Sequence, residues 1–600
     1  MTQASSDSVN RRDFARTIAA ATAATAATSL EPASADDKPK KPSKPKAPPE
    51  PPPPAALLLE TIRQRYPDKQ LDDQEVLQGI YSELRGDLAR SRRLSSFPLK
   101  NSDEPGFIFS AFRDSDCPDP LLSLQFFPPR PDVPMSLKDK HAFAPIRRLA
   151  KGLRKGDFTS LELTEFFLDR LERLGPKFNA VATVTGDLAR REARQADTEL
   201  AAGRDRGPLH GIPYGVKDLL ATRGIPTSWG AAPMKDRVID ADATVIVRLR
   251  EAGAVLAAKL AMVEIAGGLG YKQSNASFTG AGLNPWDTGR WAGGSSSGPG
   301  SAIGAGLVPF AIGSETWGSI MTPAGFCGIT GLRPTYGRVS RHGAMALSWT
   351  MDKLGPMGRT ADDCGLVLAA IAGHDPADAT SVDRDLQWSG PPDFESRPTL
   401  AVVADCDKHV QKPVRKNFRK SLDELEDFCQ IQEVTLPDLP YEDVAGTLIA
   451  CEMAAAFEGL ISSGDVWQLT APEDRWGGHA SMMISARDYI NAMRIRPKIQ
   501  STLDKLFDGV DAMVTPTLAT VAYPNNRSFG DYRRGHHASR IGGAGNAAGI
   551  PGITVPNGFG EADLPTGLQL VGRSWSETTL LAIAAKYQDE TDWHKKHPDV

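Results

Sequence analysis

Apolar residues recur at helical spacing in two segments near the start of the chain, at residues 57–66 and 74–94. Both segments are rich in helix-forming residues. The second carries apolar side chains three or four positions apart: Val76, Leu77, Ile80, Tyr81, Leu84 and Leu88. These segments predict a small helical N-terminal appendage.

From about residue 142 the pattern alternates between helix and strand periods. Thr159 and Glu162 have the spacing of a capping box before an amphipathic segment, which predicts the start of a helix. A strand is expected at 179–185 and another at 254–258, with helices at 188–202 and 241–251 between them. This alternation is typical of an α/β fold with a mixed or parallel sheet.

The second half of the chain continues the alternation. We expect an irregular stretch at 348–355, a helix at 360–372, a strand at 399–404 and a mostly helical region at 407–510. Three further strands are expected at 512–516, 553–556 and 567–571, before a closing helix at 578–587. The sequence therefore predicts one large α/β domain with a central mixed sheet over residues 141–595, preceded by an extension at 56–140.

The first 55 residues have the composition of a targeting segment and a spacer. Arg11 and Arg12 precede an Ala/Thr-rich stretch at 17–30 and then Ala-Ser-Ala at 33–35, the order of a twin-arginine export signal with its cleavage site. Residues 36–55 are rich in lysine and proline and predict an extended linker. We therefore expect a signal peptide at 1–35 and a periplasmic or secreted protein. The alternative is a disordered tail that contains an Arg-Arg pair by chance, which would leave the protein in the cytoplasm.

Charge and cysteine content exclude several classes of protein. With 69 basic and 74 acidic residues the net charge is −5, which gives no reason to expect a nucleic-acid partner. No apolar run is long enough to span a membrane, and no metal-binding motif occurs, so neither a membrane span nor a metal or other cofactor is expected. The six cysteines are scattered and predict neither a zinc site nor a disulfide framework.

The segment 293–338 contains two loops dense in glycine and serine, at 293–300 and 313–320. Glycine permits close backbone approach, so such loops suit a site where N–H groups and hydroxyls converge on a small group. A serine hydroxyl attacks an amide carbonyl only if a base removes its proton and donors stabilise the oxyanion. The apolar segment between the loops predicts a buried helix followed by a strand.

These loops, together with Gly-Ile-Pro-Tyr-Gly-Val-Lys-Asp at 211–218, closely resemble the amidase signature family of serine hydrolases over about residues 142–590. The resemblance implies a sheet sandwiched by helices, with Lys217 as base, Ser295 as the bridging cis-serine and Ser319 as nucleophile. It also implies an oxyanion hole from the N–H groups of Thr316, Trp317, Gly318 and Ser319. The implied substrate is a small-molecule amide, and a homodimer is a possible assembly. Taken alone, Lys217 is more typical of an ion-paired lysine because Asp218 follows it.

The second loop departs from the family pattern Gly-Thr-Asp-x-Gly-Gly-Ser-Ile-Arg. Glu315 replaces aspartate, Trp317 replaces glycine and Met321 replaces arginine. The usual acid-to-base contact within this loop therefore cannot form between residues 315 and 321. Trp317 and Met321 become candidate walls of the substrate pocket, with an apolar or aromatic acyl group as the expected occupant.

Three other interpretations stay open at this point. Gly-Ser-Ser-Ser-Gly at 294–298 satisfies the G-x-S-x-G elbow of α/β-hydrolase esterases, with Ser296 as nucleophile, although no buried strand precedes it. A non-catalytic protein of the same fold and a glutamine-hydrolysing component of a tRNA-dependent transamidating complex are the others. The sequence favours an exported amide hydrolase acting on linear C–N bonds.

Overall fold

The computed structural model describes residues 52–106, 137–384 and 386–600. The predicted signal peptide and most of the linker lie outside these residues, as do residues 107–136 of the predicted extension. None of the described helices is long and apolar enough to cross a membrane.

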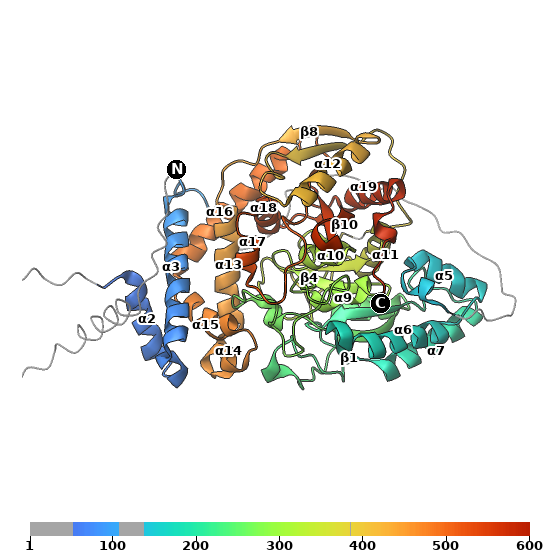
Figure 1. Cartoon of the computed structure of the whole chain (residues 1–600), viewed down its shortest axis with the longest axis horizontal. Helices are drawn as coiled ribbons and strands as arrows, with labels where there is room; N and C mark the ends of the chain where they lie inside the picture. The colour runs from blue at the N-terminus through green and yellow to red at the C-terminus, as the bar shows by residue number, and fades with distance from the viewer. Residues whose placement is uncertain (1–51, 107–136, 385) are drawn as a thin grey trace, which may run out of the picture.

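A mixed sheet of eleven strands runs through the described chain (Figure 1). The strand order is β1-β3-β2-β4-β6-β5-β10-β11-β9-β7-β8. The strands are β1 (Val181–Val184), β2 (Pro213–Lys217), β3 (Val255–Leu260), β4 (Ala311–Glu315), β5 (Thr330–Arg333), β6 (Lys353–Gly358), β7 (Thr399–Val403), β8 (Gln430–Val434), β9 (Ala512–Pro516), β10 (Gly552–Phe559) and β11 (Pro565–Val571). The predicted α/β class with a mixed sheet is confirmed.

Helices cover both faces of this sheet. In the first half of the chain they are α2 (Pro54–Arg65), α3 (Gln74–Ser96), α4 (Asp139–Ala142), α5 (Ile146–Lys155), α6 (Ser160–Leu174), α7 (Gly186–Ala201), α8 (Thr244–Glu251) and α9 (Ser297–Gly304). In the second half they are α10 (Met321–Cys327), α11 (Ala361–Ile371), α12 (Lys412–Glu426), α13 (Tyr441–Ala456), α14 (Glu458–Ser462), α15 (Pro472–Ser481), α16 (Ala486–Leu506), α17 (Phe529–Arg533), α18 (Ile541–Ala548) and α19 (Glu577–Glu590).

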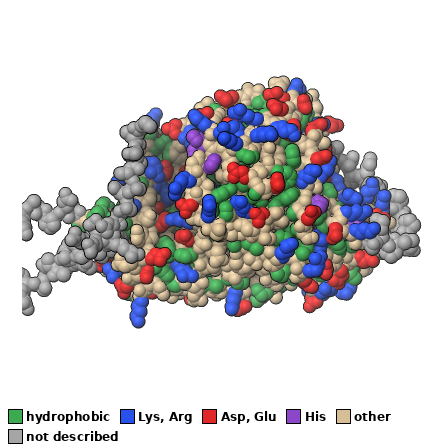
Figure 2. All heavy atoms as spheres, viewed as in Figure 1, with side chains coloured by type: hydrophobic (Ala, Val, Ile, Leu, Met, Phe, Trp, Pro, Cys, Tyr) green, Lys and Arg blue, Asp and Glu red, His purple; other side chains and the backbone are tan. Residues whose placement is uncertain are grey.

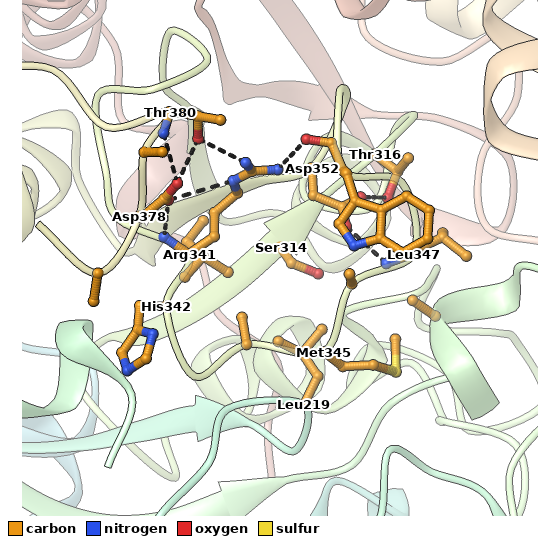
Figure 3. Close-up of a pocket in the computed structure, with 17 residues that line it drawn as sticks. Leu219, Ser314, Thr316, Arg341, His342, Met345, Leu347, Asp352, Asp378 and Thr380 are labelled. Atoms are coloured by element: carbon orange, nitrogen blue, oxygen red, sulfur yellow. Dashed lines mark hydrogen bonds and ion pairs between the residues drawn. The ribbon is translucent and has the colours of Figure 1, made fainter. Parts of the chain in front are cut away.

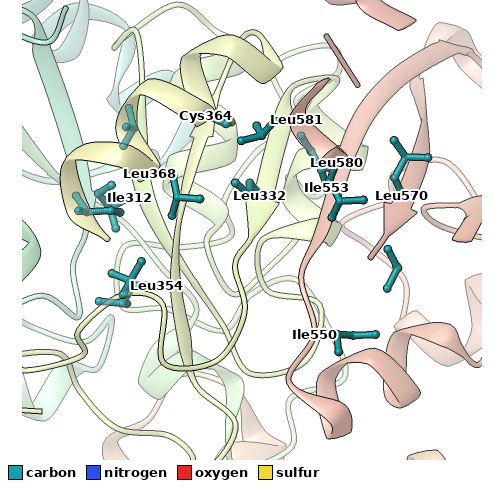
Figure 4. Close-up of a cluster of buried hydrophobic side chains, with 14 of the residues drawn as sticks. Ile312, Leu332, Leu354, Cys364, Leu368, Ile550, Ile553, Leu570, Leu580 and Leu581 are labelled. Atoms are coloured by element: carbon teal, nitrogen blue, oxygen red, sulfur yellow. The ribbon is translucent and has the colours of Figure 1, made fainter. Parts of the chain in front are cut away.

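The sheet separates two hydrophobic cores. Strand β4 shows the separation, because Ala311 packs in one core and the next residue, Ile312, packs in the other, as the two-residue period of a strand requires. The Ile312 core includes apolar side chains of α11 and α19 (Figure 4). The Ala311 core is built with α6, α7, α9 and α10. The middle of the sheet is therefore buried on both sides, and the loops at its edge are held by rigid elements.

Four strands were not predicted from the sequence. Strands β2, β5 and β6 contain glycine or proline, which weakens the strand pattern. Strand β6 contains Pro356 and begins within the stretch at 348–355 that was expected to be irregular. β6 lies between β4 and β5 in the sheet, so its pairing with both neighbours outweighs its weak strand propensity. The edge strand β8 is largely exposed, so it lacks the apolar pattern of a buried strand.

The predicted helix start before residue 160 is confirmed. The N–H of Glu162 donates to Thr159 Oγ1 at 3.1 Å, and the N–H of Thr159 donates to Glu162 Oε2 at 2.7 Å. Replacing Thr159 by alanine removes one acceptor, so we expect the free energy of unfolding to fall by about 1 kcal/mol. Urea denaturation measures this loss. Thr61→Ala, at an exposed site inside α2, is the control and should leave stability within about 0.5 kcal/mol. Equal losses in both variants would contradict the capping role.

The N-terminal appendage is helical, as predicted, and packs against the far end of the main body (Figure 1). Apolar side chains of α2 and α3 form a small core with Ala480 of α15 and with Trp467, Trp476 and Met483. Arg93 of α3 also pairs with Asp443 of α13 at 2.6 Å. The boundary at residue 140 between extension and domain stays a prediction.

Acidic and basic side chains are interspersed on the face of the molecule drawn in Figure 2. The described cysteines are unpaired, and all except the half-buried Cys451 are buried. No group of three His, Cys, Asp or Glu side chains within the described ranges is arranged to hold a metal ion.

Candidate active site

The structure brings Lys217, Ser295 and Ser319 together at one edge of the sheet. Strand β2 ends at Lys217 and pairs in parallel with β4, which ends at Glu315. The carboxyl ends of parallel neighbours lie at the same sheet edge, so Lys217 meets the loop that follows β4. Ser319 lies in that loop, just before α10, and Ser295 lies in the loop before α9.

A continuous chain of hydrogen bonds joins the three side chains. Lys217 Nζ lies 2.8 Å from Ser295 Oγ, and Ser295 Oγ lies 2.9 Å from Ser319 Oγ. Each hydroxyl can donate or accept a hydrogen bond. When Lys217 loses its proton, the hydrogen bonds can therefore be donated in the opposite direction, from Ser319 to Ser295 and from Ser295 to Lys217. The Gly294–Ser295 peptide bond is cis. The arrangement can carry a proton from Ser319 to Lys217 without histidine.

Lys217 is fully buried, and its environment favours the neutral amine. Burial lowers the pKa of Lys217 from 10.5 to about 7, although the carboxylates of Asp352 and Glu315 oppose the shift. Its other hydrogen-bond partner is the Ser314 hydroxyl, at 2.8 Å. A neutral amine at this position can accept a proton near neutral pH.

The neighbouring Asp218 does not pair with Lys217, contrary to what the sequence suggested for the lysine taken alone. Asp218 Oδ1 lies 3.0 Å from Lys259 Nζ, and Asp218 Oδ2 accepts from the N–H of Ser228 at 2.9 Å. Successive side chains of a strand point to opposite faces, so two adjacent charges can have separate partners. Asp218 therefore pairs with Lys259 and not with Lys217.

The loop 316–319 presents backbone N–H groups beside Ser319, the predicted nucleophile. Gly318 has φ +79°, a conformation that favours glycine and turns the chain sharply before Ser319. Within the described part of the chain, the N–H groups of Trp317, Gly318 and Ser319 donate to no backbone acceptor. Free donors beside a buried hydroxyl suit the stabilisation of an oxyanion.

This loop is supported by a buried ion pair that replaces the contact missing from the sequence. Glu315 Oε1 pairs with Arg333 Nη1 at 2.9 Å, and Glu315 Oε2 accepts from the N–H groups of Ile320 and Met321 at 2.9 and 3.0 Å. Burial alone would raise the pKa of Glu315, but the charges of Arg333 and Lys353 and these N–H groups hold it below its usual value. The sequence missed Arg333 because it comes from β5, outside the loop.

The Ser296 of the elbow interpretation has a different environment. Its Oγ lies 3.3 Å from both the backbone O and the backbone N of Ser314. Ser296 is the N-cap residue of α9 and is fully buried. Its hydroxyl therefore satisfies backbone groups of β4, as loop serines commonly do.

A cavity of about 380 Å³ opens beside Ser314 and Thr316 (Figure 3). Its floor is apolar and includes Leu219, Ala266, Met345, Leu347 and Leu354. Sequence reasoning did not identify these residues, since small and apolar side chains carry no recognisable motif. They place an apolar cavity next to the base, in the size range of small-molecule sites.

Charged groups at the cavity are already satisfied by other protein groups. Arg341 donates to Trp349 O at 2.5 Å and to Thr380 Oγ1 at 2.6 Å, and its backbone N–H donates to Asp378 at 2.8 Å. Asp352 accepts from Thr316 Oγ1 at 2.6 Å, and burial raises its pKa. The cavity therefore suits a group without charge.

The two predicted pocket walls have different surroundings. Trp317 is 43% exposed, next to the nucleophile loop. Met321 is buried at the start of α10, where its Sδ accepts from Thr554 Oγ1 at 3.1 Å. Neither residue lines the cavity described above, and their place in the substrate pocket stays a prediction.

The chain is similar to known proteins over most of its length. A family model described as Amidase matches residues 162–581. A Glutamyl-tRNA(Gln) amidotransferase subunit from Roseiflexus sp. (strain RS-1) is 37% identical over 481 residues, which cover 75% of this chain and 97% of the relative. The corresponding protein from Methylococcus capsulatus is 35% identical over 490 residues, covering 76% and 98%.

Solved structures show the same fold. The native peptide amidase from Stenotrophomonas maltophilia superimposes with a TM-score of 0.65 at 29% identity, covering 75% of this chain and 97% of that one. The Glutamyl-tRNA(Gln) amidotransferase subunit from Thermotoga maritima gives a TM-score of 0.64 at 26% identity, covering 77% and 97%. The chain belongs to the amidase family of enzymes that act on C–N amide bonds.

Proposed function

We propose that this protein hydrolyses a carboxylic amide through an acyl-enzyme on Ser319. The observation that supports this most directly is the hydrogen-bonded chain from the buried Lys217 through Ser295 to Ser319. The proton of Ser319 passes to Ser295 Oγ as the proton of Ser295 passes to neutral Lys217, and Ser319 Oγ attacks the carbonyl carbon. The oxyanion accepts hydrogen bonds from the N–H groups of residues 316–319.

The remaining steps use the same groups in reverse. The tetrahedral intermediate collapses, the C–N bond breaks, and the leaving amine takes the proton that Lys217 returns through Ser295. Water then attacks the acyl ester, loses a proton to the same relay and releases the carboxylic acid. The leaving amine and the acid are therefore the only products, and no cofactor is consumed.

The first test is labelling of the purified protein with a fluorophosphonate, followed by mass spectrometry of the labelled peptide. Label on Ser319 that disappears in Ser319→Ala and weakens in Lys217→Ala would support the proposal. Label on Ser296 would favour the esterase interpretation. Absence of label on folded wild-type protein would favour a non-catalytic protein.

The pKa of Lys217 predicts the pH dependence. The base must be deprotonated, so kcat/KM is expected to rise about tenfold per pH unit below pH 7 and to level off above it. Initial rates between about pH 5.5 and 9 on an uncharged amide measure this profile. A kcat/KM that is flat from about pH 5.5 to 7 would contradict Lys217 as the base.

A second candidate function is hydrolysis of glutamine within a transamidating complex. The support is the 37% identity to a Glutamyl-tRNA(Gln) amidotransferase subunit over nearly its whole length. Glutamine carries an ammonium and a carboxylate, whereas the Arg341 guanidinium at the cavity already has protein partners. Ammonia release from glutamine and from an uncharged amide of similar size distinguishes the two, and we expect faster release from the uncharged amide.

We also propose export by the twin-arginine route, on the basis of residues 10–35. Cell fractionation of the full chain tests this proposal. Wild type is expected outside the cytoplasm, and the variant with both Arg11 and Arg12 replaced by lysine is expected inside. Cytoplasmic wild-type protein would contradict export and would make the transamidating candidate stronger.

A further inference from the structure

Trp317 is a large exposed aromatic side chain beside the predicted oxyanion hole, at a position where the family pattern has glycine. Its side chain is 43% exposed, although it lies two residues from Ser319. A single exposed aromatic needs no explanation, but one at the rim of a reactive serine can contact substrate. To act as a wall of the site, this ring must be held in one position by neighbouring groups.

Glu442 lies against the same rim from another element. It belongs to the first turn of α13, and its carboxylate packs on Gly543 in the first turn of α18. A Cβ atom built on Gly543 would lie 2.3 Å from Glu442 Oε1, so an alanine there would displace the carboxylate. The Trp317 side chain and the Gly543 N–H both face the Glu442 carboxylate and favour its charged form. The Trp317 ring itself lies over the adjacent Gly542, at 3.7 Å from the corresponding Cβ position.

This contact is continuous with the support of the nucleophile loop. Asn546 of α18 donates from Nδ2 to Gly542 O at 3.0 Å and to Glu315 Oε1 at 3.1 Å. Glu315 in turn accepts from the N–H groups that follow Ser319. Helix α18 therefore meets the loop at two places, through Asn546, which contacts Glu315, and through Gly542, which lies against Trp317.

The basic residue that immediately precedes α18 pairs with groups other than Glu442. Arg540, which precedes α18, pairs with Asp438 at 2.7 Å and lies over the ring of Tyr441. Desolvation raises the pKa of the Glu442 carboxyl to about 7, although Trp317 and Gly543 lower it. Glu442 thus lies where the loop and α18 meet.

We infer that Glu442 is a positioning residue that holds the Trp317 indole as one wall of the acyl site, and that this wall selects amides with a planar aromatic acyl group. The inference rests on the proposed function, since it assumes that Ser319 is acylated. The free face of the indole then stacks on a flat ring of the substrate more favourably than on a puckered one.

The test compares 3-phenylpropanamide with 3-cyclohexylpropanamide, which share the propanamide chain and carry a planar aromatic ring and a puckered saturated ring. Wild type is expected to favour the phenyl compound in kcat/KM by about 5- to 10-fold, inside the roughly 2- to 12-fold range of aromatic pairs. Trp317→Leu should bring this ratio close to one. Glu442→Leu should lower it at least threefold, and Glu442→Gln, which keeps an acceptor, should restore part of it.

The two glycines of α18 provide a matched pair of variants. Gly543→Ala displaces the Glu442 carboxylate without changing it and is expected to lower the ratio as Glu442→Leu does. Gly542→Ala meets only an ordinary contact with Trp317 and should leave the ratio unchanged. A purely structural role for Glu442 would lower kcat/KM for both amides by the same factor and leave the ratio intact, which would overturn the inference. A wild-type ratio near one would also overturn it.

The rate of fluorophosphonate labelling at Ser319 separates this inference from the proposed function. Labelling within about threefold of wild type in the Glu442 and Gly543 variants, together with an altered ratio, supports the positioning role. No labelling in wild type means that the proposed function fails, and the inference fails with it. Normal labelling with an unchanged ratio overturns the inference alone.

Discussion

Replacing Ser319 by alanine is expected to lower kcat for amide hydrolysis by at least about 10⁴-fold, because the attacking oxygen is lost while the rest of the site stays in place. Lys217→Ala should cause a loss of similar size, since the relay then has no acceptor for the proton. Members of a catalytic unit are not additive, so the double variant should be no slower than the slower single variant. Steady-state release of ammonia from an uncharged primary amide measures all three.

Ser296→Ala is the matched control, because Ser296 is adjacent to the bridging serine and equally buried. Its hydroxyl contacts only backbone groups of Ser314, so we expect kcat to stay within about tenfold of wild type. An inactive Ser296→Ala variant, together with a Ser319→Ala variant that retains activity, would contradict the assignment. Thermal unfolding of each variant shows whether a loss of activity reflects a loss of folded protein.

The two serines and the lysine that the structure brings together could be selected from the sequence because each belongs to a short local motif. Lys217, Ser295 and Ser319 come from three segments, and the sheet brings the first and third together through the parallel pairing of β2 with β4. The strand that carries Lys217 was itself missed, since Pro213 and Gly215 obscure its period. A motif can therefore identify a reactive residue even where the element that positions it is not recognised.

The groups that tune and support the site could not be predicted, because their partners are distant in the sequence. Asp218 appeared to be a counter-ion for Lys217, but the strand geometry directs it to Lys259. Glu442 lies 101 positions from its Gly543 contact, and no local pattern connects the two. Such contacts depend on how helices dock, which a single sequence does not specify.

The support of the nucleophile loop leads to the second large effect. Arg333→Met is expected to lower the free energy of unfolding by about 3–5 kcal/mol, because it leaves the Glu315 carboxylate buried without its guanidinium partner. The carboxylate also holds the N–H groups of Ile320 and Met321, so its displacement should shift Ser319 and lower kcat by about 10²-fold. Denaturant unfolding measures the first effect, and kcat per labelled serine measures the second.

Two further variants separate the charge from the geometry of this pair. Adding Glu315→Gln to Arg333→Met removes the uncompensated charge, so we expect at least about 2 kcal/mol of stability to return, while the loss in kcat persists because the loop has lost its arginine contact. Arg338→Met breaks a comparable buried pair, at 2.9 Å, with Glu577 at the start of α19. It should cost similar stability and leave kcat per labelled serine unchanged. If kcat fell equally in Arg338→Met, or if the double variant were no more stable than Arg333→Met, the Glu315–Arg333 pair would not be the specific support of the nucleophile.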